Sequence, residues 1–142
     1  MSNPVPEREN GPLRIEPRWT DLDPIGHVNN SVYLVYAEEA RARFLGRAIP
    51  DAWRLVVVVH NSIDYHSPVE TGEVVDVTSA VEKIGTSSFV SRSVISTDNG
   101  RKCATVRTVQ VVLRPDRTGA RPWTDQERAA LTCLIDPSFT VG

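Results

Sequence analysis

A single long helical stretch is followed by strand-like runs only, and this order limits the fold more than any other feature of the chain. From residue 32 to about residue 45, apolar residues recur at helical spacing, with acids early and arginines late, an order that suits the helix dipole. These apolar residues are Val32, Val35, Tyr36, Ala40, Phe44 and Leu45. Pro50, with Gly46 before it, marks the exit from the helix. One helix of this length must be covered by a curved sheet, and the predicted class is α+β.

The strands are predicted from β-branched and alternating segments separated by turn signals. A short first strand is expected within residues 13–19. Residues 55–59 form an almost continuous β-branched run, which is typical of a strand buried on both faces. Such a curved sheet leaves the backbone N–H and C=O groups of one edge strand unpaired. We therefore expect pairing with a second copy, as a homodimer or homotetramer.

Three more strands and a short helix are expected in the second half of the chain. The strands are residues 73–84, 87–97 and 101–113. Asn99-Gly100 is a strong hairpin signal between the last two. Thr124, followed three residues later by Glu127, resembles a capping box and predicts a helix to about residue 134.

Composition favours one globular domain and excludes several classes of partner. With 142 residues and 40% hydrophobic content, we expect a single domain over 13–135, between a mobile segment 1–12 and a tail 136–142. The net charge of -2 favours neither nucleic acid nor an anionic membrane. Because no secretory signal or membrane-spanning run is recognised, a cytoplasmic protein is expected. Cys103 and Cys133 are too few for a disulfide framework or zinc site, and we predict reduced, buried thiols.

Residues 18–41 read RWTDLDPIGHVNNSVYLVYAEEAR and concentrate the polar chemistry of the chain. Two acids, a histidine and two asparagines lie in a loop punctuated by Pro24 and Gly26, and the helix follows at once. A carboxylate, an imidazole and a helix N-terminus within a dozen residues can activate water and hold an oxyanion.

This segment resembles the hotdog-fold acyl-CoA thioesterases, with the 4-hydroxybenzoyl-CoA thioesterase type as the closest group. The resemblance is carried by DLDPIGHVNN at residues 21–30, then Tyr33 and EEAR at residues 38–41, and it extends over about residues 13–134. Residues 18–23 with HVNN are also similar to acyl-ACP thioesterases, although Ile25 and Pro68 stand where those enzymes carry an Asn and an acid. The resemblance implies a curved antiparallel sheet around one central helix and hydrolysis of an acyl-CoA or acyl-ACP. Coenzyme A is then part of the substrate, and no separate cofactor is expected.

The resemblance also implies catalytic roles. Asp23 matches the family's nucleophile or general base, while Asn30, with Asn29 beside it, offers a backbone N–H to the thioester oxygen at the helix N-terminus. His27 is a candidate for orienting the reactants or protonating the leaving thiolate. An inward glutamate, Glu39 or its neighbour Glu38, could orient water from the helix. Without the resemblance, the asparagines read as helix caps and the glutamates as a solvated helix face.

Substrate contacts are expected from several parts of the chain. Gly26 and Tyr33 lie within the motif, and by resemblance Ser87 and Ser88 line the CoA groove of a neighbouring subunit. Arginines that could meet the CoA phosphates are Arg92, Arg107, Arg114, Arg117 and Arg121. Of these we assign Arg114 and Arg117, in the arginine-rich loop, to substrate binding. His60 and His66 have no metal-ligand spacing and are read as structural.

Two other functions stay open from the sequence. Hotdog enoyl-CoA hydratases carry an Asp-x-Asn-Pro-Ile-His motif, and this chain has Asp23 in place of the Asn and an inserted Gly26. A carboxylate cannot donate a hydrogen bond as that Asn should. A non-catalytic acyl-CoA binding module is the second alternative. The chain has no GxSxG elbow, P-loop or GxGxxG, so serine hydrolases and nucleotide cofactors are unsupported.

Overall fold

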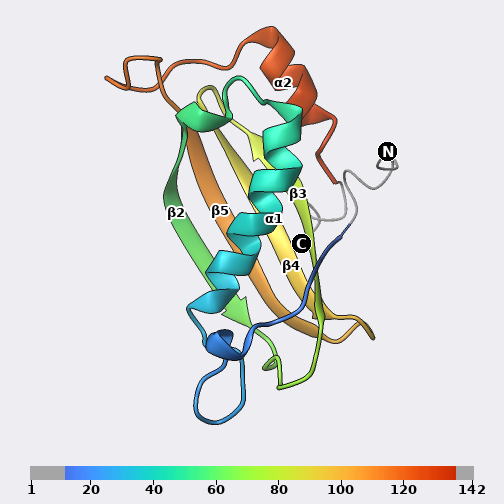
Figure 1. Cartoon of the computed structure of the whole chain (residues 1–142). Helices are drawn as coiled ribbons and strands as arrows, with labels where there is room; N and C mark the ends of the chain where they lie inside the picture. The colour runs from blue at the N-terminus through green and yellow to red at the C-terminus, as the bar shows by residue number, and fades with distance from the viewer. Residues whose placement is uncertain (1–11, 137–142) are drawn as a thin grey trace, which may run out of the picture.

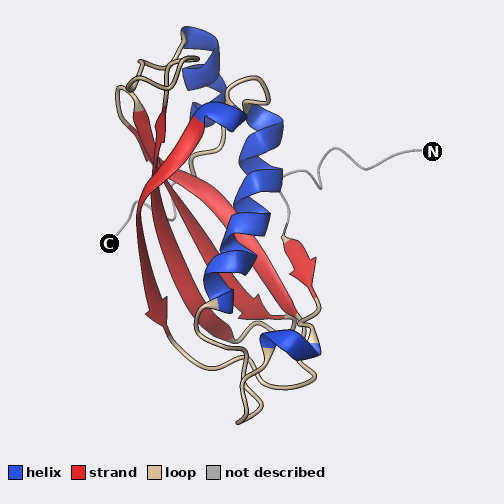
Figure 2. Cartoon of the chain, turned by 60° about the vertical axis from the view of Figure 1, so that its left-hand side comes forward, coloured by secondary structure: helices blue, strands red, loops and turns tan. Residues whose placement is uncertain are grey.

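The computed structural model describes residues 12–136, which form one curved antiparallel sheet packed against one long helix (Figures 1 and 2). The α+β prediction is therefore confirmed. Most of the predicted mobile segment 1–12 and of the predicted tail 136–142 lies outside the described residues. No helix within the described range is long and apolar enough to cross a membrane. The elements, in chain order, are β1 (Leu13–Ile15), α1 (Val32–Ala48), β2 (Val56–Tyr65), β3 (Val75–Ile84), β4 (Ser88–Thr97), β5 (Lys102–Val112) and α2 (Asp125–Thr132), with 3-10 helices at Trp19–Asp21 and Trp53–Leu55.

Helix α1 lies lengthwise against one face of the sheet (Figure 2). Its buried residues follow the three- and four-residue spacing of an amphipathic helix: they are Tyr33, Tyr36, Ala37, Ala40, Arg41, Phe44 and Leu45. Val35, predicted on this stripe, is instead exposed, because it falls about 200° around the helix from Tyr33. The helix also continues through Gly46, where a Cβ would meet the Trp53 ring at 3.6 Å, an ordinary van der Waals contact.

The five strands have the order β1-β3-β4-β5-β2, and every neighbouring pair is antiparallel. Strand β5 lies within the predicted range 101–113, and its alternate residues from Ala104 to Val112 are buried. The predicted turn between β4 and β5 is also present, with Gly100 at a positive φ of 94°. The capping box is confirmed at α2, where the Thr124 side chain accepts from the Glu127 N–H.

The core consists of two hydrophobic clusters with polar side chains between them. One cluster surrounds Tyr33, Tyr36 and Val77, and the other surrounds Phe44 and Phe89. Six of the buried polar residues occupy the intervening positions of β3, β4, β5 and α1, and we call them the polar layer: Ser79, Ser91, Ser93, Thr108, Gln110 and Arg41. Because the layer divides one core into two, it is a structural feature that apolar patterning alone does not predict.

Three expectations about burial and strand length are corrected. The run at residues 56–59 is not buried on both faces, since β2 is an edge strand that pairs, among the described residues, only with β5. Val57, Val58 and Val59 are 37%, 42% and 58% exposed. Cys103 is buried, but Cys133 is exposed just beyond α2, and both thiols are free. The first strand ends at Ile15, because the chain then turns into the 3-10 helix that starts at Trp19.

Candidate functional site

The loop before α1 is anchored by Asp21, whose carboxylate is almost fully buried at 3% exposure. Its oxygens accept from the Tyr36 hydroxyl at 2.7 Å and from the backbone and guanidinium of Arg18 at 2.9–3.2 Å. Burial alone would raise the pKa of Asp21, but the hydrogen bonds from Arg18 and Tyr36 outweigh it and hold this pKa below its usual value. The Asp21 carbonyl also accepts the Asn29 N–H at 2.8 Å. Asp21 is therefore a structural acid that closes the loop.

Asp23 has one carboxylate oxygen engaged and one available. Its Oδ1 accepts the backbone N–H groups of Ile25 and His27 at 3.1 and 3.2 Å. The backbone N–H of Asp23 donates to the His27 carbonyl at 2.8 Å, and its carbonyl accepts from Gly26. Within residues 12–136, Oδ2 of Asp23 has no hydrogen-bond partner. The turn thus fixes the carboxylate and leaves one oxygen for a ligand.

Gly26 gives this turn its shape. Its φ is +85°, in the left-handed region that favours glycine, and a Cβ there would lie 3.1 Å from Thr71 Oγ1. The Gly26 carbonyl accepts both the backbone N–H and the hydroxyl of Thr71, at 2.9 and 2.7 Å. Val28 donates to the Val69 carbonyl at 2.8 Å. The loop is therefore held against the segment between β2 and β3.

The two asparagines at the start of α1 have different roles. Asn29 forms an Asx turn just before the helix, because its side-chain oxygen accepts from the backbone N–H and hydroxyl of Ser31, the N-cap residue, at 3.0 and 2.8 Å. The carbonyl of Asn30 accepts from the Tyr65 hydroxyl at 2.9 Å. The backbone N–H of Asn30 donates to no acceptor in the described part of the chain. An unused N–H thus lies at the positive end of the α1 dipole.

These groups surround one cavity of about 500 Å³. Its wall comes from the loop, the first turn of α1 and the end of β2: Asp23, Ile25, His27, Val28, Asn29, Asn30, Tyr33, Tyr65, His66, Ser67 and Pro68. Tyr33 and Tyr65 meet edge to face at 5.3 Å, and the Tyr33 hydroxyl accepts the Val69 N–H. We call this cavity the loop pocket. Five predicted site residues line it, namely Asp23, His27, Asn29, Asn30 and Tyr33, and Gly26 shapes its rim.

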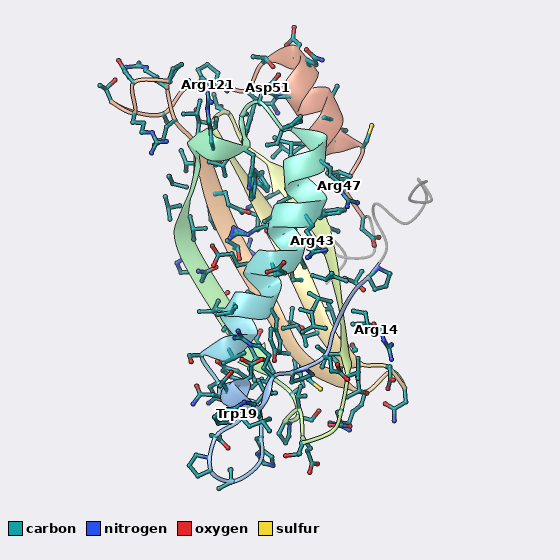
Figure 3. All side chains as sticks on the ribbon, in the orientation of Figure 1. Arg14, Trp19, Arg43, Arg47, Asp51 and Arg121 are labelled. Atoms are coloured by element: carbon teal, nitrogen blue, oxygen red, sulfur yellow. The ribbon has the colours of Figure 1, made fainter. Side chains whose placement is uncertain are left out.

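The other predicted site residues lie elsewhere in the single chain. Glu39 pairs with Arg43 at 3.1 Å on the outer side of α1 and does not line the loop pocket. Ser87 immediately precedes β4, and Ser88 is its first residue. The loop with Arg114 and Arg117 lies at the same end of the sheet, since the Val112 N–H donates to the Ser87 carbonyl. In Figure 3 this end, near the labelled Arg121 and Asp51, lies opposite the end with the labelled Trp19. One chain alone does not bring these residues to Asp23.

The five candidate arginines differ in whether they pair with an acidic side chain of the described residues. Arg92 and Arg107 contact Glu82 at 3.0 and 3.1 Å, and Arg121 holds both oxygens of Glu127 at 2.8 and 3.0 Å. Arg114 and Arg117 are exposed and form no ion pair with another described residue. The exposed pair is therefore better placed to meet an anionic ligand.

Sequence reasoning missed the contribution of residues 65–68. Tyr65 packs edge to face against Tyr33, while His66, read as structural, lines the pocket and contacts Thr105 Oγ1 through Nε2 at 3.0 Å. Arg101 holds this wall, donating to Ser67 and Pro68 while it pairs with Glu73. The one available signal was the end of a strand-like run just before Pro68. Among the described residues, no group of three or more His, Cys, Asp or Glu could hold a metal ion.

The arrangement combines a carboxylate oxygen, an imidazole and the free Asn30 N–H just before α1 around one cavity. A carboxylate can attack a carbonyl or take a proton from water. An N–H at a helix N-terminus stabilises negative charge that develops on oxygen. The loop pocket can therefore support acyl transfer to water.

Comparison with known proteins agrees with this chemistry. The thioesterase superfamily model matches residues 25–104, more than half of the chain. A thioesterase from Thermus thermophilus, solved with coenzyme A and Zn, is 34% identical, with 90% of this chain and 96% of that chain covered and a TM-score of 0.80. A predicted thioesterase from Bacillus stearothermophilus is 27% identical, with 89% and 96% covered and a TM-score of 0.81. YsmA of Bacillus subtilis is 26% identical over 121 residues, 83% of this chain and 82% of that protein. The chain therefore belongs to the thioesterase superfamily and is a thioester hydrolase with the hotdog fold.

Proposed function

We propose that the chain hydrolyses acyl-CoA thioesters in the loop pocket, with Asp23 as nucleophile or general base. The observation that carries this proposal is the pairing of a free Asp23 oxygen with a free Asn30 N–H beside the same cavity. The coenzyme A bound to the Thermus thermophilus relative supports CoA as the carrier.

Asp23 provides the oxygen that begins the reaction. Its Oδ1 is restrained by two backbone N–H groups, so that Oδ2 has a fixed position. Oδ2 either attacks the thioester carbon or takes a proton from a water that attacks it. In both cases a bond forms between carbon and oxygen, the carbon–sulfur bond breaks and CoA leaves as a thiolate. In the first case water then hydrolyses the mixed anhydride, which regenerates the Asp23 carboxylate.

The start of α1 stabilises the oxyanion. The Asn30 N–H donates to the thioester oxygen, and the helix dipole favours the charge that develops on it. Asn29 supports this geometry indirectly by binding Ser31, the N-cap residue of α1, and the Tyr65 hydroxyl donates to the Asn30 carbonyl. His27 lines the same cavity and can protonate the leaving thiolate.

A second copy of the chain completes the site in this proposal. The exposed valines of β2 form an apolar edge that antiparallel pairing with another β2 would cover. A twofold axis would place the Val56 end of one β2 beside the Tyr65 end of the other. Within one chain, the carbonyls of Ser87 and Leu55 accept from the backbone N–H groups of Val112 and Leu113, beside the Val56 end of β2. The partner's Ser87, Ser88, Arg114 and Arg117 would therefore approach this loop pocket. The exposed arginines would then meet the CoA phosphates.

Asp23→Asn is the direct test. Free-thiol release should be measured over short, medium, long-chain and aromatic acyl-CoAs, and the variant is expected to lose at least about 100-fold in kcat, the lower range of acid–base catalysis. Asp98→Asn, an exposed acid in the turn between β4 and β5 that does not line the loop pocket, is the control. Turnover in ¹⁸O water adds a readout of the nucleophile, because hydrolysis of an anhydride at the Asp23 carboxyl carbon leaves ¹⁸O in the protein. Full turnover by Asp23→Asn would disprove the assigned role.

The same assay separates the alternatives. Loss of enoyl-CoA absorbance without thiol release would indicate a hydratase. Thiol release from acyl-ACP but from no acyl-CoA would make carrier protein the substrate. Tight acyl-CoA binding without any turnover would indicate a binding module.

A further inference from the structure

A second cavity, of about 220 Å³, lies between α1, β2 and β5. Its polar lining is Glu38, Arg41, Asn61 and Thr108, and apolar side chains of the three elements complete it. The loop pocket uses Asn30 and Tyr33 of α1 and Tyr65 of β2, so the second cavity continues the same α1–β2 seam, one to three helical turns further along. We call it the seam cavity.

Arg41 is a buried cation with little compensation inside the chain. Its side chain is 9% exposed, yet its only hydrogen bond among the described residues runs from Nη1 to Gln110 Oε1, at the limiting distance of 3.5 Å. Glu38 is 3.9 Å away with 73% of its side chain exposed, so solvent screens that ion pair. The guanidinium also stands 5.9 Å from the Trp53 ring centroid. Burial lowers the pKa of Arg41, and a buried cation is costly unless acceptors surround it.

Gln110 does not need Arg41 to satisfy its own amide. Its Nε2 donates to the carbonyls of Thr108 and Phe89 at 2.7 and 3.2 Å, and its Oε1 accepts the Ser91 hydroxyl at 3.1 Å. A guanidinium has five N–H donors. Most of those of Arg41 are therefore available to the seam cavity that Arg41 lines.

Asn61 adds a second donor from the opposite wall. The register shift in β2 between Val58 and His60 is a bulge, and it changes which alternate residues face α1. After the bulge, Asn61 rather than His60 stands opposite the buried Thr108. The Thr108 hydroxyl donates to Asn61 Oδ1 at 2.7 Å, so the Asn61 amide N–H groups remain to donate. The seam cavity thus presents donors from two elements.

We infer that the seam cavity receives the far end of the acyl group, and that Arg41 and Asn61 select acyl groups with an oxygen acceptor there, a carboxylate above all. The inference rests on thioester hydrolysis in the loop pocket. From Asn30 to Arg41 the helix rises about 16 Å, and the Arg41 side chain leans back by about one turn, which leaves roughly 11 Å. Three backbone bonds span about 3.5 Å when extended, so this distance corresponds to roughly ten bonds. An acyl chain of medium length reaches it.

The test compares acyl-CoAs of equal length with methyl, hydroxyl and carboxylate ends, over about six to ten carbons. The measured quantity is the ratio of kcat/KM for the carboxylate-ended to the methyl-ended compound. We expect a wild-type ratio above one at the best length and a fall of about ten-fold or more in Arg41→Met, since a carboxylate would lose charge-assisted hydrogen bonds. Methyl-ended compounds should keep or gain activity in this variant.

Two further variants separate selection from a merely structural role. Glu38→Gln removes the competing acid and should raise the ratio, opposite to Arg41→Met. Arg43→Met removes an exposed arginine two residues away and should leave the ratio unchanged. An Arg41→Met variant that loses activity equally on all three ends would overturn the inference, as would a wild type that prefers methyl ends at every length.

Binding keeps this result separate from the fate of the proposed reaction. The same compounds should be titrated by calorimetry into Asp23→Asn and into Asp23→Asn combined with Arg41→Met. If no acyl-CoA is hydrolysed by the wild type, the proposed reaction is wrong. Binding then tests the inference by itself. Tighter binding of the carboxylate-ended compound only when Arg41 is present supports it, and any other result overturns it.

Discussion

Tyr36→Phe removes one oxygen from the anchor of the loop and leaves the aromatic ring in place. The Tyr36 hydroxyl donates to the Asp21 carboxylate at 2.7 Å, and the two residues are 4% and 3% exposed. Hydrogen bonds to charged groups contribute about 1.5–3 kcal/mol net. Because the ring packing is unchanged, we expect the free energy of unfolding to fall by about 2 kcal/mol. For a chain of this size that corresponds to roughly 7 °C in Tm.

The same substitution at Tyr65 is the matched control. Tyr65 is 49% exposed, and its hydroxyl donates to the neutral Asn30 carbonyl at 2.9 Å. Loss of this bond leaves an acceptor that water can reach, so Tyr65→Phe should cost only about 0.5 kcal/mol. Urea unfolding followed by circular dichroism, at one fixed protein concentration, measures both.

The pH dependence gives the Tyr36 prediction a second, independent readout. A carboxyl whose pKa is lower in the folded than in the unfolded protein binds fewer protons when folded. The stability from Asp21 is therefore fully present above the unfolded-state pKa, about 3.9, and is lost as pH falls through the lower folded-state pKa. Without the Tyr36 hydroxyl the pKa of Asp21 is lowered less. The difference in the free energy of unfolding between the wild type and Tyr36→Phe should therefore narrow below about pH 4. Equal losses for Tyr36→Phe and Tyr65→Phe, or a gap independent of pH, would refute the buried charged hydrogen bond.

Two other predictions test the turn and the edge strand. Gly26→Ala should destabilise the protein by about 1–2 kcal/mol, the cost of a side chain in the left-handed region, and lower kcat. Gly72→Ala, also at positive φ but with open space around it, should leave kcat unchanged in the same thiol-release assay. Val59→Lys places a charge on the exposed β2 edge and should shift the protein toward monomer in size-exclusion chromatography with light scattering, with loss of activity. A Val59→Lys protein of unchanged mass and activity would contradict pairing through β2.

Local chemistry explains why much of the fold could be predicted from the sequence. The long helix, the hairpin at Gly100 and the capping box at Thr124 depend on residues close together in the chain, and all three are present. The polar loop was recognisable for the same reason, since residues 23–30 carry a carboxylate, an imidazole and the helix start within eight positions. Such signals do not require knowledge of the tertiary arrangement.

The features that sequence could not supply depend on neighbours distant in the chain. The run at residues 56–59 has the composition of a central strand, and only the strand order shows that β2 is at the edge. Arg41, within the charged EEAR sequence, was predicted as part of the basic end of an amphipathic helix, yet Gln110 and Trp53 enclose it. The place of His66 in the loop pocket likewise follows from the end of β2 meeting the start of α1.

Asp21 and Asp23 show how the fold selects one of two similar acids for chemistry. Asp21 is buried, and its oxygens already accept four hydrogen bonds, so a proton is disfavoured there and substrate has no access. Asp23 is fixed through one oxygen only, and the other faces no donor among residues 12–136. The Asp21 carbonyl closes the loop by accepting the Asn29 N–H. This closure sets the distance from Asp23 to the start of α1. Removal of the Asp21 anchor should therefore lower kcat through the position of Asp23, although Asp21 never meets the substrate.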